Sequence, residues 1–308
     1  MAPLGWLYAL IVYSRFVFVK PTAVKPVVLC VGNAVVGGSG KTPVCLALGR
    51  RAAERGIKVH YLTRGYGGKE TGPVTVDPAR HGAEDVGDEA LLLAAIAPTW
   101  VSADRLSGAQ QAAAAGAELI VMDDGLQNPS LQKSYSILTV DGSFGFGNGL
   151  PMPAGPMREF LGTALARVNR CVITGTAEQT VEDQLVRRKP VSRAVLAPLD
   201  LLKPYEHKPV VAFAGIGQPE KFFIMLKDAG LEVTESVGFA DHHAYSESDI
   251  SRLRDLASKH RAVLLTTMKD FVRLPIPFRS EVNAVAVKLV FRNDDDCDVI
   301  LDEAMANG

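Results

Sequence analysis

The stretch 30-CVGNAVVGGSGKTP-43 decides the fold, because it joins an apolar strand to a helix through a glycine-rich turn. Its end matches the phosphate-binding motif G-x-x-x-x-G-K-[ST], but Val35 stands where that motif has its first glycine. That glycine only permits a sharp exit from the strand, and the Gly37-Gly38 pair can supply the turn later. The strand–turn–helix context is the one that the motif requires, so the stretch predicts a loop that binds a nucleoside triphosphate.

The residues of this loop indicate how the phosphates are held. Glycines let backbone N–H groups converge on phosphate oxygens, and the helix start adds its positive dipole end. A lysine at position 41 reaches the β- and γ-phosphates, and a threonine at position 42 ligates Mg²⁺. The predicted ATP-binding residues are Val35, Val36, Gly37, Gly38, Ser39, Gly40, Lys41 and Thr42. The alternative is a glycine-rich turn that merely precedes Lys-Thr.

Apolar runs and helix-like segments alternate on both sides of this loop. Strands are expected at 26–32, 57–63, 99–103, 118–124, 134–142 and 170–176, with helices at 42–55, 86–97, 105–117 and 158–168 between them. Continuous Val/Ile/Leu runs separated by helices are typical of a parallel sheet covered on both faces. The sequence therefore predicts an α/β fold, a P-loop NTPase-type parallel sheet with helices on both faces.

The length of 308 residues favours more than one domain. We expect an interfacial helix at 1–20, a P-loop kinase core at 21–176, a charged linker at 177–206 and a second, smaller α/β domain at 207–308. The net charge of −1 argues against a broad nucleic-acid-binding surface. The four cysteines form no C-x-x-C pair, which indicates buried thiols rather than a zinc site.

The N-terminal segment 4-LGWLYALIVYSRFVFVK-20 is mostly apolar and aromatic. It is shorter than the roughly 20 apolar residues of a spanning helix, and it lacks the basic start and small-residue cleavage site of a signal peptide. A helix lying in a membrane interface fits better, with Arg15 and Lys20 facing headgroups. The alternative is a first helix packed on its own domain.

Carboxylates follow another buried strand, in 118-ELIVMDDG-125. Adjacent acids at the carboxyl end of a strand lie in the crevice where open α/β sheets bind ligands. We expect Thr42, Asp123 and Asp124 to form the Mg²⁺ site, with one acid near the metal and the other orienting a neighbour. The alternative is a pair of aspartates in an ordinary turn.

Further polar side chains follow other strand ends and can receive the acceptor of the phosphoryl group. Asp88 and Glu89 come directly before an apolar helix, where Asp88 can also be a simple N-cap. His242 and His243 are adjacent, and side chains of neighbouring residues in an extended segment point in opposite directions, so one of the two is expected to act. The remaining candidates on such loops include Arg64, Tyr66, Arg158, Lys269, Asp270 and Arg273.

Taken together, these motifs resemble the tetraacyldisaccharide 4′-kinase family. The matching pieces are VGNAVVGGSGKTP, TRGYGG, VGDEA, DR at 104–105, MDDGLQNPSL, VDGSFGFGNGLPMPAGPMRE, ADHHAYSESDI and TTMKDFVRL, in family order over about residues 28–275. The resemblance implies Mg²⁺-dependent transfer of the ATP γ-phosphoryl group to the 4′-hydroxyl of tetraacyldisaccharide 1-phosphate. The product is lipid IVA, an intermediate of lipid A biosynthesis.

The resemblance also implies residue roles. Asp88 matches the catalytic aspartate, and a histidine of the DHH sequence assists it; we favour His243 over His242. The residues implied on the substrate side are Arg64, Tyr66, Glu89, Gln127, Asn128 and Arg158. Two positions depart from the family: Asn128 stands where a histidine is frequent, and Met268 replaces an acid of the T-E-K-D pattern.

A four-chain acyl substrate stays in the membrane, so the resemblance favours the interfacial reading of residues 1–20. The expected location is the cytoplasm, peripheral on the cytoplasmic face of the bacterial inner membrane, with a membrane-embedded glycolipid substrate, no nucleic acid and no obligate protein partner. The alternative function is a P-loop ATPase or GTPase regulator or a metallochaperone. The sequence lacks the N-K-x-D motif and the Cys/His clusters that are typical of those classes.

Overall fold

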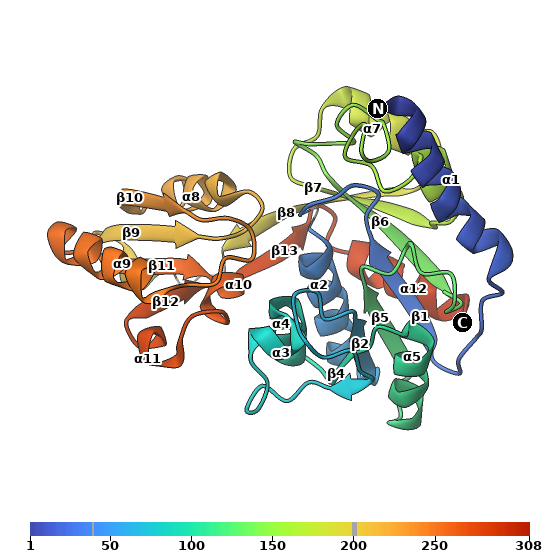
Figure 1. Cartoon of the computed structure of the whole chain (residues 1–308), viewed down its shortest axis with the longest axis horizontal. Coiled ribbons are helices and arrows are strands. Elements are labelled where there is room, and N and C mark those ends of the chain that lie inside the picture. Colours follow the sequence, from blue (N-terminus) through green and yellow to red (C-terminus); the bar gives the residue numbers. More distant parts are fainter. Residues whose placement is uncertain (39, 199–201) are drawn as a thin grey trace.

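A computed structural model describes residues 1–38, 40–198 and 202–308 of the chain. Two sheets, each with helices on both faces, lie side by side (Figure 1). The α/β fold predicted from the alternation of apolar runs is confirmed. Ser39, one of the predicted loop residues, lies outside the described part of the chain.

Among the described residues the larger sheet has nine strands, in the order β13-β8-β7-β6-β1-β5-β2-β4-β3. Their bounds are β1 (Val27–Gly32), β2 (Val59–Thr63), β3 (Val74–Thr75), β4 (Thr99–Val101), β5 (Leu119–Asp123), β6 (Tyr135–Asp141), β7 (Arg170–Thr174), β8 (Val191–Pro198) and β13 (Val287–Phe291). Neighbours are parallel except at the two edges, where β3 and β13 run antiparallel to β4 and β8. The carboxyl ends of the central strands β1, β5 and β2 therefore meet on one side of the sheet.

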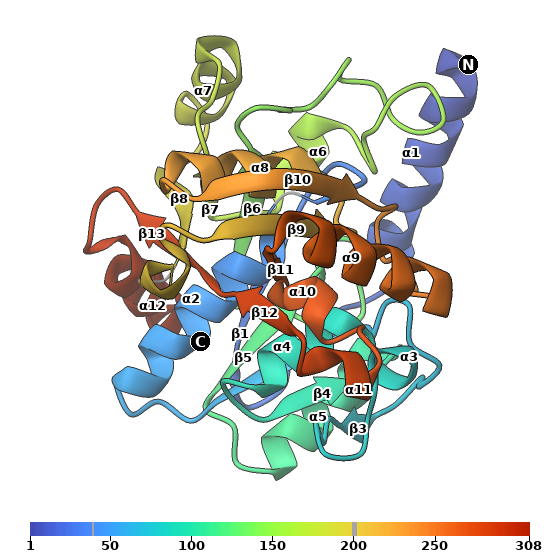
Figure 2. The same cartoon turned by 90° about the vertical axis from the view of Figure 1, so that its left-hand side faces the viewer.

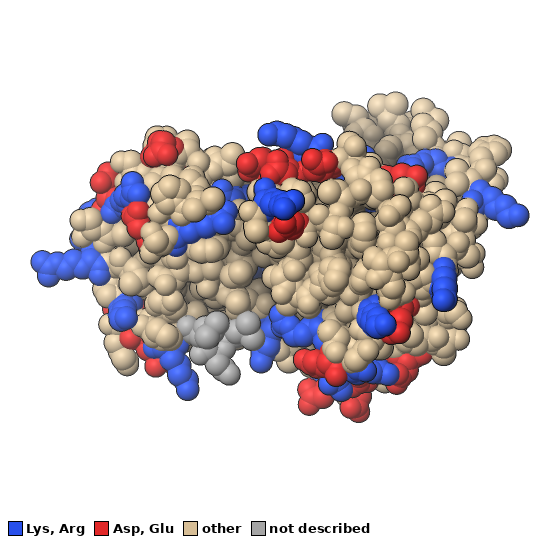
Figure 3. Space-filling view, turned by 90° about the horizontal axis from the view of Figure 1, so that it is seen from below, with Lys and Arg blue, Asp and Glu red and all other residues tan. Residues whose placement is uncertain are grey.

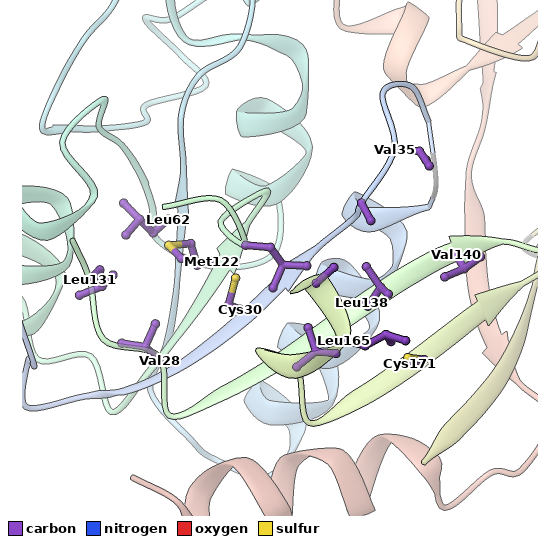
Figure 4. Packing of buried hydrophobic residues seen from close by; sticks show 14 of the residues in the cluster. Val28, Cys30, Val35, Leu62, Met122, Leu131, Leu138, Val140, Leu165 and Cys171 are labelled. Carbon is purple, nitrogen blue, oxygen red and sulfur yellow. The ribbon is translucent and has the colours of Figure 1, made fainter. Parts of the chain in front are cut away.

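Strand side chains alternate between two cores because successive residues of a strand point to opposite faces. Val28 and Cys30 of β1 belong to the core under α5 (Arg105–Ala114), α6 (Leu161–Ala166) and α7 (Gln179–Val186), and Figure 4 shows Cys30 in this cluster. Leu29 and Val31 belong to the other core, under α2 (Lys41–Glu54), α4 (Asp88–Ala94) and α12 (Asp296–Ala306). The central strands are thus buried on both faces, as their unbroken apolar sequences predict.

The smaller sheet has the order β10-β9-β11-β12, with β9 (Pro209–Ala214), β10 (Glu232–Gly238), β11 (Val263–Thr267) and β12 (Val282–Val285) all parallel. On one face α8 (Pro219–Asp228) buries Phe222 and Phe223, and on the other α9 (Glu247–His260) buries Ile250 and Leu253. Figure 2 shows this domain in front of the larger one. The remaining elements are α1 (Ala2–Phe18), α3 (Ala83–Val86), a 3₁₀ turn at Lys203–Tyr205, α10 (Met268–Phe271) and α11 (Ile276–Arg279).

The predicted linker and C-terminal boundary are wrong. Residues 177–206 contain α7 and β8, which are parts of the larger domain, and after β12 the chain returns to that domain through β13 and α12. Val282–Val285 and Val287–Phe291 are separated by Ala286 alone and read as one apolar run, so periodicity did not reveal that they join different sheets. The small domain is an insertion whose two ends leave through the antiparallel pair β8–β13.

Ion pairs fasten the returning helix α12 to α2. Arg51 contacts Asp298 at 2.7 Å, and Arg55 contacts Asp302 at 2.6 Å. Helix α12 is therefore held by buried apolar contacts and by paired charges at their rim.

Elsewhere, basic and acidic side chains are interspersed on the face drawn in Figure 3.

Helix α1 rests on the larger domain through a ridge of small residues. Gly5, Ala9 and Val12 are buried, and a Cβ at Gly5 would lie 2.6 Å from the carbonyl oxygen of Pro151. The large apolar side chains that point outward are at least half exposed: Leu4, Trp6, Leu7, Leu10, Ile11, Tyr13, Val17 and Phe18. Within the described ranges, no helix has the length and hydropathy needed to cross a bilayer.

Gly49 brings α2 close to β2, and its replacement tests this packing. A Cβ at Gly49 would lie 1.9 Å from the Tyr61 hydroxyl, which donates a hydrogen bond to the carbonyl oxygen of Cys45. We expect Gly49→Ala to lower the free energy of unfolding by about 1–3 kcal/mol through overpacking, measured by urea denaturation. Gly162→Ala in α6, where a Cβ meets no atom within 4 Å, is the control and should be neutral or stabilising. Equal loss in both variants would contradict the packing argument.

Candidate active site

The phosphate loop between β1 and α2 is held from the side by the Pro/Gly-rich segment 150–159. Val35 is buried and forms an antiparallel bridge with Met157, and the backbone N–H of Val36 donates to the carbonyl oxygen of Pro156 at 2.8 Å. Gly40 caps α2 with a φ of 77°, in the left-handed region that favours glycine. Val35 therefore does not replace a phosphate-contacting glycine; it anchors the start of the loop in the core.

Two acids at the end of β5 face the first residues of α2. The Thr42 hydroxyl donates to Asp123 Oδ2 at 2.9 Å, and Lys41 Nζ lies 3.8 Å from Asp124 Oδ2. Asp123 is fully buried, and its Oδ1 has no hydrogen-bond partner among the described residues. The structure thus brings together Lys41, Thr42, Asp123 and Asp124, the residues predicted for the phosphates and the metal.

The electrostatics of Asp123 fit a bound cation. Burial raises the pKa of the Asp123 carboxyl to about 7, the charges of Glu89 and Asp124 act in the same direction, and Lys41 opposes them. A buried carboxylate with an unused oxygen beside a threonine hydroxyl offers the hard oxygen ligands that Mg²⁺ takes, usually together with substrate phosphates. These residues therefore fit the metal that the phosphate loop implies.

A chain of polar contacts runs from Asp124 away from the phosphate loop. Arg158 Nη1 donates to both carboxylate oxygens of Asp124, at 2.8 and 3.0 Å, and to Gln127 Oε1 at 3.4 Å. Gln127 Nε2 donates to Glu159 Oε1 at 2.9 Å, and the Glu159 carboxylate pairs with Arg167 at 2.5 Å. Arg158 and Gln127, both predicted on the substrate side, are engaged in this network in the structure.

Asp88 is the second buried carboxylate of the site, 2% exposed at the first residue of α4. Its Oδ2 lies 3.0 Å from His242 Nδ1 and 3.4 Å from Arg273 Nε, both from the small domain. Burial alone raises the pKa of the Asp88 carboxyl, but the hydrogen bond with His242 and the charges of Lys269 and Arg273 outweigh it and hold the pKa below its usual value. Asp88 is therefore ionised and paired across the domain interface.

The preference for His243 as the partner of Asp88 is wrong. His243 Nε2 contacts Asp249 at 3.0 Å, and its ring stacks on Phe239 with centroids 4.7 Å apart. His242 has a φ of 58°, an uncommon left-handed conformation for a residue with a side chain, and it reaches Asp88 instead. This backbone conformation was not evident from the sequence, because neither glycine nor asparagine stands at position 242.

The other predicted substrate-side residues differ in their surroundings. The ring of Tyr66 lies 5.3 Å from that of His242, and Glu89 lies 3.7 Å from Lys269 Nζ, so both border the Asp88 contact. Arg64 is exposed on the loop before Tyr66. Asn128 instead accepts the backbone N–H of Leu131 at 3.1 Å and serves the turn after β5.

Sequence reasoning missed residues that join the two domains. Lys221 of α8 contacts Asp141, at the end of β6, at 2.6 Å, and a Cβ at Gly217 would lie 3.8 Å from the backbone nitrogen of Gly38. The signal for Asp141 was present, since it ends an apolar strand as Asp123 does. Glu159 was also missed, and its burial is not evident from an acid that follows Arg158 in a loop.

A family model, relatives in sequence and a solved structure each match most of the chain, and they all point to the same family. A family model described as "Tetraacyldisaccharide-1-P 4'-kinase" matches residues 1–306. The "Tetraacyldisaccharide 4'-kinase" of Parvibaculum lavamentivorans is 48% identical over 277 residues, which are 89% of this chain and 81% of the relative. The protein of the same name from Maricaulis maris is 44% identical over 311 residues, covering 99% of this chain and 90% of the relative. The crystal structure of LpxK from Aquifex aeolicus in complex with ATP is similar over 98% of both chains, with 26% identity and a TM-score of 0.77.

Arg273 offers a test of the interface, because it pairs with two buried acids, Asp88 and, at 2.6 Å, Asp270. Arg273→Met leaves both carboxylates without this cation, and we expect a loss of about 3–5 kcal/mol in the free energy of unfolding, measured by urea denaturation with circular dichroism. Arg254→Met removes the cation of the half-exposed Arg254–Glu281 pair and should cost no more than about 1 kcal/mol. Similar losses in the two variants would contradict the role given to burial.

Proposed function

Because the chain belongs to the tetraacyldisaccharide-1-P 4′-kinase family, we propose that it transfers the γ-phosphoryl group of ATP to the 4′-hydroxyl of tetraacyldisaccharide 1-phosphate, forming lipid IVA. The family assignment makes it an enzyme of lipid A biosynthesis and decides against a regulatory ATPase, a GTPase or a metallochaperone. The observation that carries the site assignment is the contact of the buried Asp88 with His242, on the side of the sheet where Lys41 meets Asp124.

On the donor side, the loop before α2 binds the phosphates of ATP. Backbone N–H groups around Gly37, Gly38 and Gly40 and the N-terminus of α2 attract phosphate oxygens, and Lys41 neutralises their charge. Thr42 and Asp123 hold Mg²⁺, and Asp124 keeps Lys41 in place. When bound, Mg²⁺ neutralises charge that develops on the transferred phosphoryl group.

On the acceptor side, Asp88 takes the proton of the attacking 4′-hydroxyl. Its ionised state, maintained by His242, Lys269 and Arg273, makes it a proton acceptor at neutral pH. His242 orients the carboxylate through the contact of its Nδ1 with Asp88 Oδ2. In this proposal the sugar is contacted by Tyr66 and Glu89, which border the Asp88–His242 contact, and by Arg64 on the same loop as Tyr66.

Asp88→Asn tests the proposed base. The amide keeps the size of the side chain but accepts no proton, so we expect the turnover of Mg-ATP and tetraacyldisaccharide 1-phosphate to fall by about 10²–10⁴-fold. ATP affinity, measured by calorimetry, should stay near that of the unchanged protein because Lys41 and the loop are intact. Full turnover in this variant would remove Asp88 from the mechanism, and an inactive parent protein would refute the function itself.

The two histidines provide a matched pair. His242→Gln removes the imidazole that meets Asp88, and we expect a loss of turnover of about 100-fold or more. His243→Gln removes a contact with Asp249 of α9 instead of the contact with Asp88, and it should change turnover only slightly. The same phosphorylation assay measures both variants, and a larger loss at His243 would reverse the assignment.

We also propose that α1 makes the peripheral contact with the cytoplasmic face of the inner membrane, where the acyl chains of the substrate lie. Its outward face carries Leu7, Leu10 and Ile11, each more than half exposed, and the exposed Arg15 and Lys20 follow them. Apolar side chains enter the interface, and each nearby basic residue adds about 1 kcal/mol toward anionic lipid. The observation in support is that the helix buries small residues and exposes large apolar ones.

Vesicle binding tests this contact. Leu7→Ser with Leu10→Ser should weaken binding to vesicles of anionic phospholipid by at least about tenfold, because each leucine contributes about 1.5–3 kcal/mol when buried. Both side chains are exposed in the structure, so thermal stability should be unchanged. Ile276→Ser on α11 removes an apolar side chain that is 77% exposed elsewhere and is the control. Equal binding by all variants would exclude α1 as the membrane contact.

A further inference from the structure

Phe16, near the end of α1, covers a partly buried charge. The guanidinium carbon of Arg167 lies 3.8 Å from the centre of the Phe16 ring, within the range of a cation–π interaction. Arg167 Nε is buried and has no hydrogen-bond partner among the described residues, so the ring face is part of the stabilisation of this cation. Through this ring the apolar helix α1 contacts charged groups of the larger domain: Arg167 and, with its Nζ 6.0 Å from the ring centre, Lys133.

From Arg167 a series of contacts leads to the phosphate loop. Arg167 pairs with Glu159, which accepts a hydrogen bond from Gln127 Nε2. Gln127 Oε1 in turn accepts a hydrogen bond from Arg158 Nη1, which also binds Asp124. Asp124 is in turn the carboxylate beside Lys41. Each step is a direct contact between side chains, and the side chains that form ion pairs are at most 31% exposed.

Within this series of contacts, the side-chain amide of Gln127 has two orientations that differ by a flip of its oxygen and NH₂ group. An ionised Glu159 only accepts hydrogen bonds, so it binds the NH₂ end of the amide and leaves the oxygen for Arg158. The same NH₂ group also donates to the carbonyl oxygen of Asn33, directly after β1, at 3.0 Å. The reversed amide would present donors to Arg158, which has no acceptor, and Arg158 would then turn from Gln127. Asp124 binds both Arg158 and Lys41. When Asp124 binds Arg158 less strongly, it pairs more strongly with Lys41, and this ion pair competes with phosphate for the lysine.

We propose that Phe16, Arg167 and Glu159 are positioning residues through which the seating of α1 sets the state of the phosphate loop. The inference rests on the proposed function for the role of ATP, but the contacts themselves do not depend on it. Figure 1 shows α1 on the side of the larger domain away from the small domain. The site is therefore supported from two sides, by the small domain at Asp88 and by α1 at Asp124.

Hydrogen–deuterium exchange and ATP binding of the full chain test the proposal. In Phe16→Leu the helix keeps an apolar side chain but loses the ring, and we expect faster exchange in peptides covering residues 30–45 and a three- to tenfold weaker ATP affinity. Phe16→Tyr keeps the ring and should behave as the unchanged protein. Phe18→Leu changes the next aromatic side chain of α1, which is 84% exposed, and should change neither measurement.

A double-mutant cycle separates coupling from local damage. Glu159→Gln should produce the same changes as Phe16→Leu, and the double variant should be no worse than Glu159→Gln alone, since both act through one chain of contacts. The proposal is overturned if Phe16→Leu behaves as Phe18→Leu, or if the two fold-changes multiply. If Glu159→Gln does not fold, the comparison of Leu, Tyr and the Phe18 control decides. Failure of kinase turnover in the unchanged protein would refute the proposed function, and the exchange result would still test this inference.

Discussion

The structure depends on the pairing of one buried carboxylate across two domains. Asp88 lies at the start of a helix of the larger domain, and its partners, His242 and Arg273, come from the smaller one. An unpaired charge at this depth is strongly destabilising, so the closed arrangement of the domains and the ionised state of Asp88 support each other. The same contact supplies the paired, ionised acid that a proton-accepting role requires.

The second centre of charge lies at the start of α2. Lys41 and Thr42 face Asp123 and Asp124, and burial raises the pKa of the Asp123 carboxyl, with the negative charges of Glu89 and Asp124 acting in the same direction against the single positive charge of Lys41. A site with this imbalance binds cations, and a glycine-rich loop before a helix binds anions. A site that binds both a cation and an anion suits a metal-bound polyphosphate. The phosphoryl donor would therefore bind at the same edge of the sheet as Asp88, the proposed proton acceptor.

Much of the fold was predictable from the sequence because parallel strands buried on both faces have continuous apolar sequences. The strand predicted at 118–124 is β5, and the acids at its end lie where open α/β sheets bind ligands. The C-terminal boundary was not predictable in this way, since β12 and β13 differ only in the sheet they join. The choice between His242 and His243 failed for a local reason: an extended backbone was assumed, and the left-handed conformation of His242 turns its side chain toward Asp88. The burial of Glu159 and the position of Arg167 depend on tertiary contacts with α1 and the turn after β5, for which a single sequence contains no periodic signal.

The late return of the chain to the larger domain has a consequence for synthesis on the ribosome. Ile300, Leu301 and Ala304 of α12 are fully buried in the core that also contains Leu48 and Ala52 of α2. Until α12 has left the exit tunnel, the helix that follows the phosphate loop lacks part of its apolar support. The inserted small domain, complete in sequence by then, can form first, whereas a prematurely terminated polypeptide has an unfinished nucleotide site. Formation of the nucleotide site thereby depends on translation through α12.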